Sequence, residues 1–309
     1  MSHVFCQTVK IDQLEAIKVE HPLFSATLLL QGAQLIEFTP NSRTMDSSHL
    51  KNLLWLSDSV QYQQGKPLRG GIPICWPWFG NLDKNPNVIQ DQVKPEAQAG
   101  AHGFARTMPW IVHSIIENCG YVEIILELTN TPESKNIWPY EFNLKARFVF
   151  SKTLKVELIT TNTGTDSFAI SQALHTYLPT SDITKTYIHN AHASRYIDAL
   201  DNWKVKKQVG KIGFSEETDR LYFFTGNDKA KPEYQLRVES PNLQLILNNS
   251  HSQSAVIWNP WIDKSKWLSQ FSPEDFNKMY CIETANVMSD HKIVEPQQQQ
   301  RLSFELSEL

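Results

Sequence analysis

Four polar residues lie where the surrounding sequence favours less reactive side chains. His175 lies within FAISQALHTYL and Glu283 within YCIETANV, two otherwise apolar runs. His102 opens HGFAR after a polar loop, and Asp219 directly precedes RLYFF. The pKa of histidine, about 6.5, leaves both protonation states accessible near neutral pH. A carboxylate among apolar neighbours is seldom buried without a partner, and burial raises its pKa. These residue types in these surroundings indicate acid–base chemistry.

Each of these residues also has an ordinary structural explanation, which the sequence leaves open. A lone histidine on a strand, such as His175, can be a core or surface side chain with satisfied hydrogen bonds. Glu283 could face solvent from its strand, and Asp219 alone would be a turn or capping residue. Arg106, at the end of HGFAR, would alone be assigned to the surface.

A further candidate is the stretch RGGIPICWPWFG, residues 69–80. Its two glycines allow positive φ angles or a close approach of the backbone to a ligand, and its two prolines exclude a regular helix. An arginine at this place suits an anionic ligand. The aromatic side chains offer flat faces on which a sugar ring could stack: Trp76, Trp78 and Phe79. The alternative is a proline-stiffened core loop whose aromatics only pack.

The composition excludes several classes of partner. The 309 residues carry a formal net charge of −4, so no basic field indicates nucleic acid. No run approaches the ~20 apolar residues that span a membrane, and the first twenty residues lack the apolar segment of a signal peptide. The cysteines form no C-x-x-C and are typical of reduced, unpaired thiols: Cys6, Cys75, Cys119 and Cys281. We therefore expect a cytoplasmic protein with neither nucleic-acid nor membrane partners.

Metal and nucleotide motifs have little support. His189 and His192 form an H-x-x-H pair, but no cysteine or carboxylate at a recognisable ligand spacing accompanies them, so two surface histidines are the preferred interpretation. The patterns of dinucleotide-binding, NTP-binding, α/β-hydrolase and zincin sites do not occur. We expect no metal and no cofactor.

The elements that would position these residues are mostly β-strands. Short apolar or alternating runs, bounded by Gly, Pro, Asn, Asp or Ser, recur along the chain and predict strands. In FNLKARFVF (142–150) the apolar residues alternate on one face. The other candidates are 24–30, 34–40, 53–56, 110–118, 121–130, 154–162, 168–178, 234–240, 243–249, 254–260, 280–287 and 301–306.

Long amphipathic helices are absent, and only PEDFNKM (273–279) predicts a short helical turn, with Ser272 as N-cap. The polar stretch 185–233 is expected to form long excursions from the same sheets, and QQQQ (297–300) a turn before the last strand. No Pro/Ser/Gly-rich linker divides the chain, so we expect one domain over residues 1–309. The density of short strands predicts an all-β, antiparallel sandwich with few short helices.

Several of these motifs together resemble a known family. RGGIPICWPWFG, AHGFAR, ALHTYL, ETDRLY, IWNPW and YCIETAN, in this order over about residues 25–305, are similar to the motifs of the glucose-6-phosphate 1-epimerases. These are hexose-6-phosphate mutarotases of the aldose 1-epimerase superfamily. The resemblance implies a galactose-mutarotase-like β-supersandwich, in agreement with the strand pattern.

The resemblance also implies a role for each candidate residue. His175 would be the general acid and Glu283 the general base of ring opening and closure, a reaction that needs no metal or cofactor. His102 would bind the sugar and polarise the ring region, and Asp219 would bind a hydroxyl or orient the site. The phosphate would be held through charge-assisted hydrogen bonds by two arginines, Arg69 and Arg106.

The expected activity is therefore the interconversion of α and β anomers of hexose 6-phosphates, glucose 6-phosphate above all. The expected partner is the small sugar phosphate alone, and we expect a monomer. A non-catalytic carbohydrate-binding protein on the same fold is one alternative, but the joint presence of His175 and Glu283 argues against it. A mutarotase of unphosphorylated aldoses is another, and the two arginines argue against that.

Overall fold

The computed structural model describes residues 5–41, 51–224 and 233–309, and within them strands dominate. The expected all-β antiparallel architecture is confirmed, and every pairing between the strands is antiparallel. The strands are β1 (Cys6–Ile11), β2 (Leu14–His21), β3 (Phe24–Leu29), β4 (Leu35–Pro40), β5 (Ile74–Cys75), β6 (Ile111–Glu117), β7 (Val122–Thr129), β8 (Phe142–Phe150), β9 (Leu154–Asn162), β10 (Phe168–Ile170), β11 (Gln172–Pro179), β12 (Tyr187–His189), β13 (Arg195–Asp198), β14 (Lys204–Lys207), β15 (Ile212–Gly213), β16 (Thr218–Phe223), β17 (Glu233–Glu239), β18 (Gln244–Ser250), β19 (Ser254–Asn259), β20 (Met279–Asn286), β21 (Lys292–Val294) and β22 (Gln299–Glu308).

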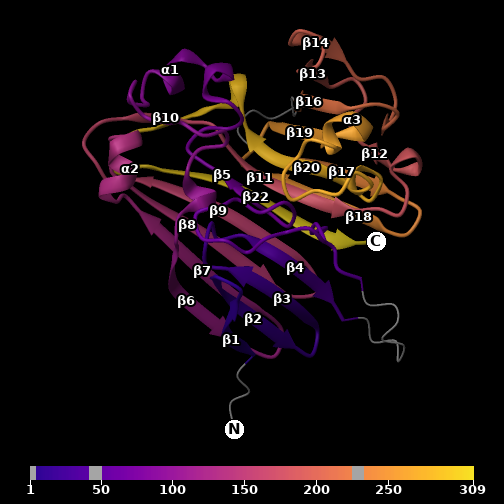
Figure 1. Cartoon of the computed structure of the whole chain (residues 1–309), viewed down its shortest axis with the longest axis horizontal. Helices are drawn as coiled ribbons and strands as arrows, with labels where there is room; N and C mark the ends of the chain where they lie inside the picture. Colours follow the sequence, from indigo (N-terminus) through magenta and orange to yellow (C-terminus); the bar gives the residue numbers. More distant parts are fainter. Residues whose placement is uncertain (1–4, 42–50, 225–232) are drawn as a thin grey trace.

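Two large sheets and two smaller ones make up the fold (Figure 1). The nine-stranded sheet has the order β15-β12-β17-β18-β22-β9-β8-β7-β6, and the seven-stranded sheet has the order β14-β13-β16-β19-β20-β11-β5. Strands β1 to β4 form a separate four-stranded sheet, and β10 pairs with β21. In β8 every second side chain is buried, as the alternation of FNLKARFVF predicts, and these side chains join the main core.

The centre of the seven-stranded sheet is buried on both faces. All eight residues of β20 are buried, and so are all residues of β11 except its last. One face of these strands packs into the main core with Leu174 and Ile282, whereas Ala173 and Ala285 belong to a smaller apolar cluster on the other face. Polar side chains on that second face therefore lie inside the protein rather than in bulk water.

Most predicted strands are present, and the differences have local causes. Residues 53–56 form no strand, because only Leu56 makes an isolated bridge, to Gly70. The run 168–178 is two strands, β10 and β11, separated at Ser171. The last strand begins inside the glutamine run, at Gln299. The stretch 185–233 supplies β12 to β16 and the start of β17 to both large sheets, as expected, with 225–232 outside the described residues.

Helices are short, as predicted: α1 (Asn87–Gln90), α2 (Pro132–Ile137) and α3 (Trp261–Ser265), with the 3-10 turns η2 (Leu82–Lys84), η3 (Ala105–Thr107), η4 (Ile183–Lys185), η5 (Asp275–Asn277) and η6 (Met288–Asp290). The turn predicted in PEDFNKM is η5, but its N-cap is Glu274. The Ser272 hydroxyl instead contacts the hydroxyl of Ser59, 2.9 Å away. None of the helices in the described ranges is long and apolar enough to cross a membrane.

Two glycines fix the path of the chain into β5. Gly70 and Gly71 have φ angles of 121° and 63°, in the range that favours glycine. A Cβ atom on Gly71 would lie 2.1 Å from the carbonyl oxygen of Leu35. That oxygen accepts a hydrogen bond from Ile72, and the amide of Gly71 donates to Trp55. The close approach that the glycines allow is therefore to neighbouring backbone.

The first prediction compares Gly71→Ala with Gly65→Ala. Gly65 also has a positive φ, 72°, but a Cβ atom there would meet nothing within 4 Å. Gly65→Ala should lower the free energy of unfolding by about 1 kcal/mol, the cost of a left-handed conformation. Gly71→Ala should lower it by roughly 2–5 kcal/mol, because a clash with backbone is added. Denaturant unfolding measures both, and equal losses would contradict this explanation.

Candidate active site

His175 and Glu283 face each other across two neighbouring strands. In the antiparallel pairing of β11 with β20, His175 is the direct partner of Glu283. The imidazole Nε2 lies 3.3 Å from the carboxylate Oε1. His175 is 8% exposed and Glu283 is 1% exposed. The two candidate catalytic residues, 108 positions apart in the sequence numbering, thus form one buried pair.

The loop around Gly71 holds the strand that carries His175. The amide of His175 donates to the carbonyl oxygen of Pro73 (3.0 Å), and the amide of Tyr177 donates to that of Gly71 (2.9 Å). The imidazole stacks on the ring of Tyr177, with 4.8 Å between centroids and 14° between planes. Backbone hydrogen bonds and ring stacking together restrict how His175 can move.

His102 lies beside the His175–Glu283 pair, in a turn with a strained backbone conformation. Its φ angle is 65°, and its Nδ1 accepts a hydrogen bond from the amide of Gly80 (3.2 Å). A neutral imidazole that accepts at Nδ1 carries its proton on Nε2. Burial, Arg106, His175 and Arg69 lower the pKa of His102, which keeps the ring neutral. Its ring centroid lies 5.6 Å from that of His175, so it can act as a hydrogen-bond donor beside the pair.

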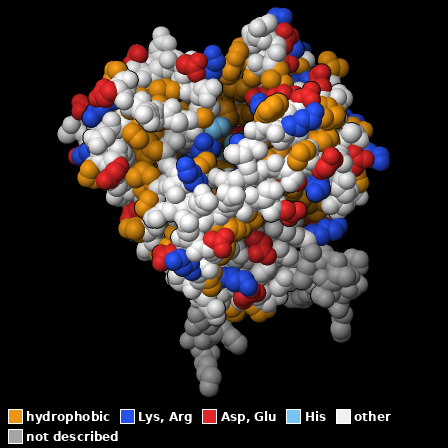
Figure 2. Space-filling model, in the orientation of Figure 1, with side chains coloured by type: hydrophobic (Ala, Val, Ile, Leu, Met, Phe, Trp, Pro, Cys, Tyr) orange, Lys and Arg blue, Asp and Glu red, His pale blue; other side chains and the backbone are white. Residues whose placement is uncertain are grey.

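Most of the predicted site residues line one cavity. It has a volume of about 420 Å³, within the range of small-molecule sites, and opens on the face shown in Figure 2. There the surface is hollowed between the part that carries α1 and the part that carries β13 and β14, and a histidine surface is visible inside. Five of the six predicted site residues line this cavity: Arg69, His102, His175, Asp219 and Glu283.

Arg106 is the predicted residue that does not line the cavity. Its guanidinium donates a hydrogen bond of 2.7 Å to the carbonyl oxygen of Ala101, which does line it. The two positive charges of Arg106 and Arg69 both lower the pKa of His175. Arg106 therefore acts on the site from behind the loop that carries His102, as a brace of that loop and as a nearby charge.

The backbone around Arg69 is held by a buried glutamine. The side-chain amide of Gln34 donates to the carbonyl oxygen of Gly70 at 2.7 Å and to that of Leu68 at 3.5 Å. These carbonyls flank Arg69, whose own carbonyl oxygen accepts from the amide of Ser57. Arg69 makes no ion pair with a carboxylate in the part of the chain that the structure describes. Its Nε donates to the carbonyl oxygen of Ser269 (3.4 Å), so an anion that contacts the guanidinium has no carboxylate of the described residues to displace.

Sequence reasoning missed two lysines and an aromatic residue in the cavity wall. Lys84 pairs with Asp83 at 3.0 Å, and Lys264 pairs with Glu217 at 2.8 Å. Trp203 lies in the turn between β13 and β14. The only signal for Lys264 was its position just after the motif IWNPW, and the turn with Trp203 carried no motif at all.

Two tryptophans that the sequence offered for sugar stacking belong to the core. Trp76 is fully buried, packs against Trp138 and Phe142, and donates from Nε1 to the hydroxyl of Thr160. Trp78 is also buried, and its Nε1 donates to the carbonyl oxygen of Gly100. That interpretation is wrong for both, because their faces are covered by protein. Of the three aromatics, only Phe79 lines the cavity.

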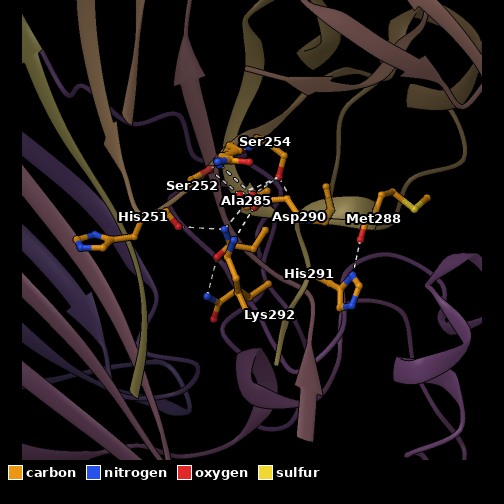
Figure 3. Close-up of polar contacts among 12 residues, drawn as sticks. His251, Ser252, Ser254, Ala285, Met288, Asp290, His291 and Lys292 are labelled. Carbon is orange, nitrogen blue, oxygen red and sulfur yellow. Dashed lines mark hydrogen bonds and ion pairs between the residues drawn. The ribbon is translucent and has the colours of Figure 1, made fainter. Parts of the chain in front are cut away.

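A buried polar cluster fixes the end of β20 (Figure 3). The carboxylate of Asp290 accepts from the hydroxyl of Ser254 (3.1 Å) and the side-chain amide of Asn286 (3.0 Å), and it pairs with Lys292 (2.6 Å). Met288, whose side chain lines the cavity, lies between these anchors in η6. The cluster therefore holds in place β20, which carries Glu283, and one residue of the cavity wall.

The H-x-x-H histidines separate in the structure. His189 Nε2 lies 2.9 Å from the carboxylate of Glu239, and His192 Nδ1 accepts from the amide of Gly210. Across residues 5–41, 51–224 and 233–309, no three His, Cys, Asp or Glu side chains are arranged to hold a metal ion.

The electrostatics of the pair favour uncharged groups. Burial, followed by Arg69 and Arg106, lowers the pKa of His175 to about 3. Burial, followed by the charge of Asp219, raises the pKa of Glu283 well above its usual range. Burial also raises the pKa of Asp219. These opposite shifts favour a protonated Glu283 carboxyl and a neutral His175 imidazole. Such a pair always contains one acid and one base.

The antiparallel β-sandwich is the fold of galactose mutarotase-like proteins of known structure. The chain belongs to the aldose 1-epimerase family, whose model matches residues 15–307. It is 31% identical over 287 residues to a protein of Escherichia coli (strain K12) named "Putative glucose-6-phosphate 1-epimerase", covering 92% of this chain and 87% of that one. A protein of the same name from Salmonella typhimurium is 30% identical, with 93% and 88% covered.

The solved structures agree. A crystal structure of a "putative mutarotase" from Salmonella typhimurium superposes with a TM-score of 0.82 and 27% identity, covering 98% of this chain and 93% of that one. A galactose 1-epimerase from Lactobacillus acidophilus shares the fold, with a TM-score of 0.67 over 98% of each chain. The chain is therefore an isomerase of the aldose 1-epimerase, or mutarotase, class, as its motifs predicted.

The second prediction concerns stability against pH. Because the folded-state pKa of Glu283 is raised, the unfolded chain loses this proton first, and the wild type loses stability as pH rises above about 4.3. His175 has a lowered pKa and costs stability only as pH falls below about 6.5. Above pH 6.5, Glu283 is therefore the member of the pair that still changes the free energy of unfolding with pH. Glu283→Gln should remove this pH dependence and unfold at higher denaturant concentration at pH 8 than the wild type.

The gain of Glu283→Gln over the wild type should grow with pH by up to about 1.4 kcal/mol per pH unit. A matched control is Glu20→Gln, which replaces a glutamate whose side chain is 62% exposed and should keep the wild-type pH dependence. Parallel stability curves for Glu283→Gln and the wild type between pH 6.5 and 8.5 would contradict a protonated, buried Glu283.

Proposed function

We propose that the protein interconverts the α and β anomers of hexose 6-phosphates, with glucose 6-phosphate as the main substrate. The observation that supports the proposal is a cavity lined both by candidate acid–base residues and by cationic side chains. One wall holds the His175–Glu283 pair beside His102, and three cationic side chains from other segments complete the lining: Arg69, Lys84 and Lys264. The names of the relatives, glucose-6-phosphate 1-epimerases, point to the same substrate.

The reaction needs two proton transfers. Ring opening removes the proton from O1 of the cyclic hemiacetal and delivers a proton to O5, so the C1–O5 bond breaks and a carbonyl forms at C1. Rotation about C1–C2 and the reverse transfers close the ring as the other anomer. Glu283 is the proposed base at O1 and His175 the proposed acid at O5. His102 is proposed to donate from Nε2–H to a sugar oxygen, consistent with its acceptor role at Nδ1.

Binding of the phosphate would also raise the pKa of His175, the proposed acid. Arg69 and Arg106 lower the pKa of His175, after burial itself. A phosphate dianion beside Arg69 offsets part of that positive charge, so binding raises the affinity of the imidazole for a proton. The proton then moves from Glu283 to His175. The ionised Glu283 can act as the base at O1, and the protonated His175 can act as the acid at O5. Free glucose lacks this effect.

The third prediction tests the pair. Glu283→Gln and His175→Asn should each slow α/β exchange of glucose 6-phosphate by about 10²–10⁴-fold, the usual contribution of one acid or base. The double variant should lose less than the product, because the two groups share one proton. Magnetisation-exchange NMR in a chelator-containing buffer measures the rates. Exchange at the wild-type rate in either single variant removes that residue from its proposed role.

The fourth prediction separates the two arginines. Arg69→Ala should raise KM for glucose 6-phosphate by about 10- to 150-fold, equivalent to one hydrogen bond to a charged group of roughly 1.5–3 kcal/mol, with a smaller change in kcat. Exchange of free glucose should not slow, because no phosphate loses its partner and removal of the Arg69 charge only raises the pKa of His175. Arg106→Ala should instead slow both sugars alike, since Arg106 braces the loop of His102. If Arg69→Ala affected both sugars equally, the assignment to phosphorylated hexoses would lose its main support.

A further inference from the structure

Trp203 has a backbone conformation that tryptophan rarely adopts. It follows Asn202 in the turn between β13 and β14, and the φ angles of the two residues are 50° and 58°. The amide of Lys204 donates to the carbonyl oxygen of Asp201, which closes a β-turn with both residues at its centre. Two positive φ angles define the type I′ class, whose second central position strongly favours glycine. A bulky residue there is a true outlier and points to a local function.

The strain is not explained by packing in the core. The side chain of Trp203 is 36% exposed and lines the cavity of the acid–base pair. The other aromatic wall residues are engaged: the ring of Phe79 meets His102 edge-on, and Trp258 does the same to His175 and Tyr177. Among the aromatic rings of the described residues, none packs against the ring of Trp203. The side chain of Trp203 therefore lines the cavity without being covered by another aromatic ring of the described residues.

The turn is held close to the reacting groups. The amide of Ala199 donates to the carbonyl oxygen of Asp219, so the base of the hairpin is bonded to the strand that carries a predicted sugar-binding residue. Asp198 accepts from the amide of Leu200 and from Lys206, which ties the two sides of the hairpin together. Trp203 thus has a defined position at the rim rather than a loose one.

We propose that Trp203 is the platform that packs against the apolar C–H face of the hexose ring in this cavity. The inference rests on the proposed function for the nature of the ligand. It adds a specificity-determining contact that depends on the ring and not on the phosphate. An exposed aromatic face contributes most to binding free energy when it covers an apolar surface of similar size. The C–H face of a pyranose ring is such a surface. The strained turn is retained because it aims this face at the ligand.

The test replaces Trp203 by asparagine, which tolerates positive φ, and by phenylalanine, which keeps an aromatic face. Trp203→Asn should raise KM roughly 3- to 10-fold, the usual worth of one aromatic contact, for glucose 6-phosphate and for free glucose alike. The change in kcat should be small. Trp203→Phe should recover most of the loss. The thermal midpoint of Trp203→Asn should equal or exceed that of the wild type, because strain is relieved.

Trp267→Asn is the matched control, since Trp267 is 86% exposed and does not line the cavity. It should leave both KM values unchanged. Unchanged KM values in Trp203→Asn would overturn the inference, as would a loss confined to glucose 6-phosphate or a fall of the midpoint by more than about 5 °C, the mark of a packing role. If the wild type bound hexoses without exchanging anomers, only the proposed function would fail, and dissociation constants would replace KM. A wild type that bound neither sugar would overturn both.

Discussion

The register between β11 and β20 is the constraint on which the site depends. It places His175 opposite Glu283, and a slip of either strand by one residue would turn its side chain toward the main core, where Leu174 and Ile282 now pack. Both strands are interior strands of the seven-stranded sheet, so their neighbours fix the register from each side. The geometry of the proposed acid–base pair is thus determined by sheet pairing.

The same arrangement has a cost in stability. Nδ1 of His175 and Oε2 of Glu283 are buried and have no hydrogen-bond partner among the residues that the structure describes. Unsatisfied buried polar atoms are unfavourable, and they persist where function requires them. The surrounding structure offsets this cost with rigid supports. The backbone of the loop after Arg69 bonds to β11, and the Asp290 cluster anchors the end of β20.

Much of this organisation could be read from the sequence, because strands with clean apolar periodicity are defined locally. FNLKARFVF became β8 with the same ends, and LKVELITTN became β9. The site residues were recognisable because a histidine and a glutamate interrupted such runs. Contacts between residues that lie far apart in the sequence could not be predicted from it. The strand expected at 53–56 does not form, and the side chains of Trp76 and Trp78 are buried in the core. Trp203 lines the cavity from a turn whose backbone conformation is unfavourable for tryptophan.

The positions of the cationic side chains show why charge type alone could not identify contacts for the proposed phosphate. HGFAR places an arginine four residues after His102, but the chain turns so that its guanidinium bonds to the carbonyl of Ala101 behind the cavity. Lys84 and Lys264 line the cavity, yet each already pairs with a carboxylate. An incoming phosphate would have to compete with those partners for them. Arg69 has no carboxylate partner among the described residues, although its Nε donates to the carbonyl oxygen of Ser269. Gln34 fixes the backbone on both sides of it. Availability and pre-organisation, more than proximity in sequence, therefore make Arg69 the strongest candidate for the anionic end of the substrate.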